Sequence, residues 1–319
     1  MTDHERDDFG DLRRDVERLP KSIEPPRDLW PDIAARLATA GRRRAWRPLV
    51  WLPALAAAAG VVVLLLGRAR APGVEVSVLA GRPQRGGAPI TGRTTLRAGE
   101  RLSTDDSSRA HLQLSIGEVD VEGGTRLRVL AVRRREQRFA LERGTISARV
   151  SAPPRVFVVE TPSAVATDLG CAYTLAVDSV GNGVLRVTAG IVAFGSPGRV
   201  AFVPLGAAVP THAGRGPGLP YVDDAAPALR RALERVDSAP GDRTALAAAL
   251  AAARADDGIS LWHLVARVDE AWRGAVFDRL AQLVPAPLGV TREGVVRLDR
   301  RMLDAWWNYL PRTVWRVGF

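Results

Sequence analysis

The chain has 319 residues, with 45 lysines and arginines against 35 aspartates and glutamates, one cysteine and four histidines. A hydrophobic share of 46% excludes wholesale disorder, and the length allows two or three domains. One cysteine and scattered histidines exclude disulfide scaffolds and zinc fingers, so we expect no metal site and no cofactor. Lys21 is the only lysine, so the net charge of +10 reflects a general use of arginine, and no direct nucleic-acid binding is expected.

The first segment, residues 1–47, is too short to bury a core, yet it carries apolar residues at helical spacing. Pro25 and Pro26 separate the two helices that this spacing predicts. The first stripe is Leu12, Val16 and Leu19, and the second is Leu29 or Trp30, Ile33 and Leu37. The two stripes either pack on each other and on a membrane surface, or fold against a cytoplasmic protein as helices in a groove.

A run of twenty uncharged residues, 48–67, follows this segment. At 1.5 Å per residue it would cross a hydrocarbon core of about 30 Å, which predicts a transmembrane helix rather than a buried core helix. Four arginines between residues 42 and 47 favour a cytoplasmic N-terminus. A cleaved secretory signal is the alternative because residues 69–71 resemble a cleavage site, but Pro72 and the long charged region before the run weaken it.

From Val74 to about Thr211 the apolar residues alternate with polar ones, which predicts strands. A weak repeat places a glycine between two apolar pieces at Gly99, Gly144 and Gly190, spaced by 45 and 46 residues. We expect the chain to bend at these glycines, because a bend needs a residue without a Cβ atom. The pattern predicts an all-β domain, either twisted and solenoid-like or two-layered.

The strand region resembles the FecR-domain family of membrane-anchored regulators over about residues 75–215. The resemblance rests on the runs LRAGERLSTDDSSRAHLQLSIGEVDVEGGTRLRVL and FALERGTISARV, on Thr161-Pro162, on the corner 170–173 and on Gly190. It implies a short cytoplasmic anti-sigma segment, one membrane span and a periplasmic β domain. Cys171 and Tyr173 depart from the Thr and Phe more usual in the family, and no siderophore signal is implied because the C-terminal residues do not resemble the receptor-contacting domain.

The resemblance also assigns a role to the two N-terminal stripes. It implies that residues 1–47 bind an extracytoplasmic-function sigma factor. The residues that we expect to make this contact are Leu12, Val16, Leu19, Leu29, Trp30, Ile33 and Leu37.

Beyond residue 220 the composition shifts to Ala, Leu and Arg, which predicts helices. Asp242 and Ser260 are expected to cap two of them. The adjacent Trp306 and Trp307 cannot share one helical face, so we expect one to pack inward and the other to cover a groove or a neighbouring domain. Among strand residues, Cys171 is expected to be a buried thiol with a raised pKa.

The predicted fold class is a multidomain chain with a helical cytoplasmic segment (1–47), one transmembrane helix (48–67), an all-β domain (75–215) and an α-helical C-terminal domain (221–319). The predicted function is a single-pass regulator in the inner membrane, with its C-terminal domains periplasmic, that passes a signal to a sigma factor. We expect no enzyme, because no nucleophile constellation is present. The alternative is an anchored envelope scaffold or cell-wall-binding protein, with an unknown periplasmic protein or cell-wall ligand as partner in either case.

Overall fold

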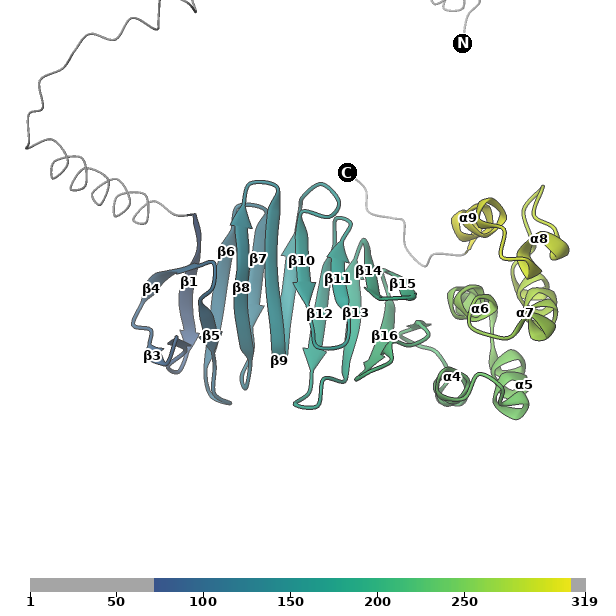
Figure 1. The fold of residues 1–319 in the computed structure, drawn as a ribbon, viewed down its shortest axis with the longest axis horizontal. Coiled ribbons are helices and arrows are strands. Elements are labelled where there is room, and N and C mark those ends of the chain that lie inside the picture. Colours follow the sequence, from purple (N-terminus) through teal and green to yellow (C-terminus); the bar gives the residue numbers. More distant parts are fainter. Residues whose placement is uncertain (1–71, 311–319) are drawn as a thin grey trace, which may run out of the picture. The chain divides into compact units, whose positions relative to one another are not determined.

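The computed structural model describes residues 72–310, which belong to one compact unit. Strands come first and helices follow (Figure 1). The strands are β1 (Gly73–Ala80), β2 (Gln84–Arg85), β3 (Ala88–Pro89), β4 (Arg93–Arg97), β5 (Arg101–Ser103), β6 (Arg109–Leu114), β7 (Gly117–Val121), β8 (Arg126–Arg133), β9 (Glu136–Val150), β10 (Phe157–Glu160), β11 (Val165–Asp168), β12 (Ala172–Val177), β13 (Gly183–Ala189), β14 (Ile191–Ser196), β15 (Arg199–Pro204), β16 (Ala207–His212), β17 (Gly216–Pro217) and β18 (Tyr221–Val222). The helices are α4 (Pro227–Ser238), α5 (Arg243–Ala252), the 3₁₀ turn η1 (Ala255–Asp257), α6 (Gly258–Val265), α7 (Glu270–Leu283), α8 (Arg292–Val296) and α9 (Arg300–Tyr309).

The strands form two hydrogen-bonded layers. In the first layer the order is β4, β1, β6, β7, β9, β12, β13, β16, with β17 and β18 pairing to β16. In the second layer the order is β3, β2, β5, β8, β9, β10, β11, β14, β15. The long strand β9 belongs to both layers, because residues 136–143 pair in the second layer and residues 144–150 pair in the first. The network of the described strands does not close on itself.

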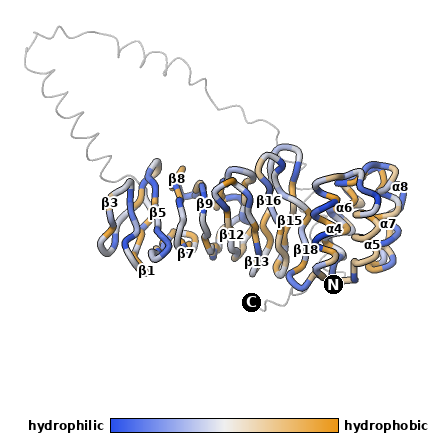
Figure 2. Tube along the Cα trace, turned by 90° about the horizontal axis from the view of Figure 1, so that it is seen from below, coloured by the Kyte–Doolittle hydropathy of each residue, from blue (hydrophilic) through white to orange (hydrophobic). Residues whose placement is uncertain are grey.

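One core lies between the two layers, because hydrophilic and hydrophobic residues alternate along the strands (Figure 2). Its largest fully buried side chains include Phe139, Phe157 and Phe194, and the first two rings lie 5.6 Å apart. The helices bury a second core of their own. Ile259 of α6 packs into the core of the strands, so the helices are attached to the layers by apolar contact.

The repeated glycines lie at bends, as predicted, and at each of these bends the chain passes from one layer to the other. Gly99 separates β4 from β5, Gly144 divides β9, and Gly190 separates β13 from β14. All three have a positive φ, of 91°, 93° and 69°. At Gly144 a Cβ atom would collide with the backbone of Thr125, so only glycine fits this bend.

The predicted fold class requires correction. No helix within residues 72–310 combines the length and the apolar character that crossing a membrane requires. The predicted transmembrane helix is not among the described helices: its residues 48–67, like the segment 1–47, lie outside the described residues. The solenoid-like alternative is also not observed, because stacked coils need parallel pairing and β9 with β10 is the one parallel pair among the described strands. The two-layer alternative describes the strands.

Most local predictions for the helices are confirmed, and one is wrong. The Asp242 carboxylate accepts the backbone N–H of Ala245 at 2.9 Å and caps α5. Ser260 was expected at an N-cap but lies inside α6, where its hydroxyl donates to the carbonyl of Pro220 at 2.8 Å. This bond ties α6 to the segment that joins the strands to the helices.

Candidate functional site

The candidate site is the junction between the last strands and the helices. Trp307 of α9 contacts the ring of Phe202 on β15, with centroids 5.9 Å apart. Trp306, by contrast, is fully buried among the helices and packs edge-on against Phe277 at 5.0 Å. The expectation that one tryptophan packs inward while the other covers a neighbouring domain is confirmed. The junction is therefore built by aromatic side chains as well as by hydrogen bonds.

His263 of α6 holds the edge of the second layer. β15 pairs with β14 on one side, and the backbone N–H of Phe202 donates to Nε2 of His263 at 3.0 Å. Because an amide N–H can only donate, Nε2 is the acceptor, and Nδ1 carries the proton that it donates to the carbonyl of Ile259 at 2.9 Å. A helix thus satisfies a donor that the strand edge would otherwise leave free.

The surroundings of His263 keep its ring neutral. The side chain is 4% exposed and lies against Trp262 and Trp307, at ring distances of 4.8 and 5.7 Å. The pKa of His263 is lowered to about 4, chiefly by burial; the hydrogen bond to Ile259 opposes this shift, and the charge of Arg267 adds to it. The neutral tautomer that accepts from β15 is therefore the form present near neutral pH.

A buried carboxylate forms the ionic part of the junction. The side chain of Asp237, on α4, is 3% exposed, and its Oδ1 lies 2.9 Å from Arg199 of β15 and 3.7 Å from Arg267. Arg267 also donates to the carbonyl of Pro217 at 3.2 Å. Burial, together with the charge of Arg199, lowers the pKa of the Arg267 guanidinium. The other oxygen of Asp237, Oδ2, has no hydrogen-bond partner.

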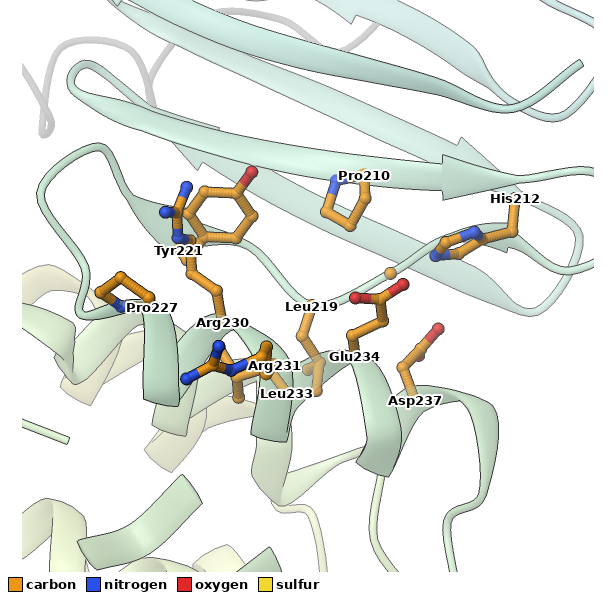
Figure 3. Close-up of a pocket in the computed structure, with 11 residues that line it drawn as sticks. Pro210, His212, Leu219, Tyr221, Pro227, Arg230, Arg231, Leu233, Glu234 and Asp237 are labelled. Atoms are coloured by element: carbon orange, nitrogen blue, oxygen red, sulfur yellow. The ribbon is translucent and has the colours of Figure 1, made fainter. Parts of the chain in front are cut away.

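A pocket of about 310 Å³ opens beside this carboxylate (Figure 3). One wall is the outer face of β16, another is the connection through β17 and β18, and the third is one face of α4. Its principal lining residues are Pro210, His212, Tyr221, Arg230, Glu234 and Asp237. Pockets at the boundary between two packed units are common places for small ligands.

The pocket carries charges of both signs that are not neutralised within the protein. Arg230 lies over the ring of Tyr221, 5.6 Å from its centroid, and forms no ion pair with any residue in 72–310. Glu234 has no cationic partner in the same range, and Figure 3 shows its carboxylate near the imidazole of His212. The positive charge of Arg230 and the negative charge of Glu234 therefore lie at different positions along α4, at two ends of the pocket.

The corner that contains Cys171 is structural in character. Cys171 is buried at 4% exposure, and its thiol donates to Oδ1 of Asp168. Burial, and after it the hydrogen bond to Asp168, raises the pKa of the thiol, which agrees with the expectation from its apolar neighbours. Within residues 72–310 no group of three His, Cys, Asp or Glu side chains is placed to hold a metal ion.

The residues predicted to bind a sigma factor all lie outside the described residues: Leu12, Val16, Leu19, Leu29, Trp30, Ile33 and Leu37. The junction residues Asp237, Arg199 and His263 were not predicted from the sequence, because they lie on separate elements and the histidines show no metal-ligand spacing. The sequence did contain one signal for His263, which lies within the apolar helical turn 261–265. A histidine in such a turn is expected to be buried, and a buried imidazole needs hydrogen-bond partners.

Comparison with known proteins identifies the strand region. Two crystal structures of a proposed anti-sigma factor from Parabacteroides distasonis match with 18% identity and a TM-score of 0.35, over 42% of this chain and 64% of that protein. The match thus spans less than two thirds of that protein, and this degree of likeness carries no argument about function. No curated protein matches the sequence. The family model described as "FecR protein" matches residues 100–193. The resemblance to the FecR family seen in the sequence is therefore confirmed over residues 100–193.

Proposed function

We propose that this chain is a FecR-type regulator that restrains a sigma factor through residues 1–47. The observation that carries the proposal is the FecR domain at residues 100–193, which supports a regulator of this type. The two apolar stripes of the N-terminal segment support a helical contact with a partner, because helices of about ten residues are marginal in water until they pack on something. Restraint needs only that this segment cover the sigma factor, so the proposed function involves no catalysis.

The test is capture of the sigma factor encoded beside this chain by the full-length protein. Replacing Trp30 with Ala removes the largest apolar side chain of the second stripe, and an interface residue of this kind contributes about 2–4 kcal/mol. We therefore expect Trp30→Ala to weaken capture by roughly 30-fold or more, since each 1.4 kcal/mol is tenfold. Ile33→Asp should do the same, because it places a charge within the stripe.

The matched control is Arg36→Ala, which changes the same predicted helix outside the apolar stripe and should leave capture unchanged. If the wild-type protein captures no sigma factor, or if Trp30→Ala binds as tightly as wild type, the proposed partner is wrong. The scaffold or cell-wall-binding alternative would then be the better explanation. The location of residues 72–310 outside the cytoplasm also stays a prediction, and an inactive alkaline phosphatase fused after Phe319 would contradict it.

A further inference from the structure

The pocket beside Asp237 combines three features that the junction itself does not require. It is a hollow of about 310 Å³, it contains unpaired charges of both signs, and it is bordered by a buried oxygen without a hydrogen-bond partner. The junction uses only Oδ1 of Asp237, through Arg199 and Arg267. The remaining features point to a ligand.

The charges are ordered along one face of α4. Arg230, Glu234 and Asp237 are four and three residues apart, so their side chains leave the helix on the same side. With a rise of 1.5 Å per residue, Arg230 lies about 6 Å along the axis from Glu234 and about 10 Å from Asp237. Figure 3 shows Arg230 beside Tyr221 at one end and the two carboxylates near His212 at the other. A complementary ligand carries an anionic group and a cationic group separated by a similar length.

The negative end favours a donor with several hydrogens. Oδ2 of Asp237 is buried without a hydrogen-bond partner but is closed to solvent, so a group in the pocket meets the exposed carboxylate of Glu234 first. Glu234 supplies a second acceptor close by in the same wall. The charge of Asp237 is already paired with Arg199 and Arg267, whereas Glu234 has no cationic partner within residues 72–310. An ammonium group has three donors and a positive charge, so it can supply the counter-charge that Glu234 lacks, which an uncharged donor cannot do.

We propose that this pocket binds a short peptide of about two residues with free termini. The ammonium terminus lies at Glu234, and the carboxylate terminus lies at Arg230. An extended chain spans about 3.3–3.6 Å per residue, so two residues match the separation of the charges, and a single amino acid does not. The apolar side chains of Pro210, Leu219 and Leu233 line the middle of the pocket and suit small apolar side chains of the peptide.

The experiment is calorimetric titration of the full-length protein with dialanine, N-acetyl-dialanine, dialanine amide and free alanine. We expect saturable binding of dialanine, at least tenfold weaker binding of both blocked forms, and at least tenfold weaker binding of alanine. The measurement contains no sigma factor, so its outcome is independent of the proposed function.

Charge variants assign the two ends of the peptide. Arg230→Gln should bind dialanine and its amide equally, because the carboxylate has lost its partner. For Glu234→Gln, the difference in affinity between dialanine and N-acetyl-dialanine should be much smaller than for the wild-type protein. The matched control is Glu270→Gln, an exposed glutamate on α7 outside the pocket, which should bind as wild type does.

Three results would overturn the proposal. The first is no saturable binding of dialanine at millimolar concentration. The second is equal binding of the blocked and free peptides by the wild-type protein. The third is binding of free alanine as tight as that of dialanine, which would contradict the assigned ligand length.

Discussion

His263 offers the sharpest test of how the helices are attached to the strands. Replacing it with Leu keeps an apolar side chain of similar size but leaves the N–H of Phe202 without its acceptor. A buried donor without a partner costs about 1–3 kcal/mol, so we expect the free energy of unfolding to fall by this amount. His263→Gln is the matched control, because its side-chain carbonyl can take the place of Nε2 and should restore most of the loss.

The same bond predicts a dependence on pH. The folded protein holds His263 neutral with a pKa of about 4, whereas an unfolded chain takes up a proton near the ordinary value of 6.5. Between these values the unfolded state binds more protons, so the stability supplied by this group is complete above pH 6.5 and is lost as the pH falls toward 4. At 1.36 kcal/mol per pKa unit, the loss at pH 4.5 is about 2–3 kcal/mol.

The assay is urea unfolding of the full-length wild-type, Leu and Gln proteins at pH 7.5 and pH 4.5. Neither variant has a titratable side chain at this position. The free energy of unfolding of wild type minus that of His263→Leu, which we call the advantage of wild type, should therefore fall by about 2–3 kcal/mol from pH 7.5 to pH 4.5. Hydrogen exchange at the Phe202 amide should be faster in the Leu variant than in wild type. The reasoning is refuted if the advantage is the same at both pH values, or if the Gln and Leu variants are equally destabilised.

Two further predictions concern the strands. Gly144→Ala should destabilise the protein by more than Gly99→Ala. The two residues have nearly the same φ, 93° and 91°, but of the two only Gly144 is placed so that an added Cβ atom meets backbone atoms. The left-handed conformation alone costs about 1–2 kcal/mol, so thermal unfolding should show a loss of this size for Gly99→Ala, and equal losses would contradict the steric argument. The Cys171 thiol should react with a thiol reagent at pH 8 only after the protein is unfolded, since burial raises its pKa, and rapid labelling of the folded protein would contradict its placement.

The sequence predicted features that depend on local pattern. Gly99, Gly144 and Gly190 could be found because each bend imposes a requirement on a single residue. The hydrogen bond between Phe202 and His263 could not be predicted from the sequence, because the two residues are 61 positions apart and no spacing rule connects a strand edge to a helix. The predicted N-cap at Ser260 failed for a similar reason. Serine favours an N-cap, but α6 begins at Gly258, and the Ser260 hydroxyl donates to the distant carbonyl of Pro220 instead.

The membership of β9 in both layers bears on the order in which the strands can assemble as the chain becomes available from its N-terminal end. β7 and β8 lie before it in the sequence, and each has one long edge that only β9 pairs. β10 and β12, which are made later, pair on its other side, the first with residues 137–140 and the second with residues 144–149. One edge of β7 and one edge of β8 therefore stay unpaired until residues 136–150 become available to fold. The later half is then added to a template that already fixes the register of both layers.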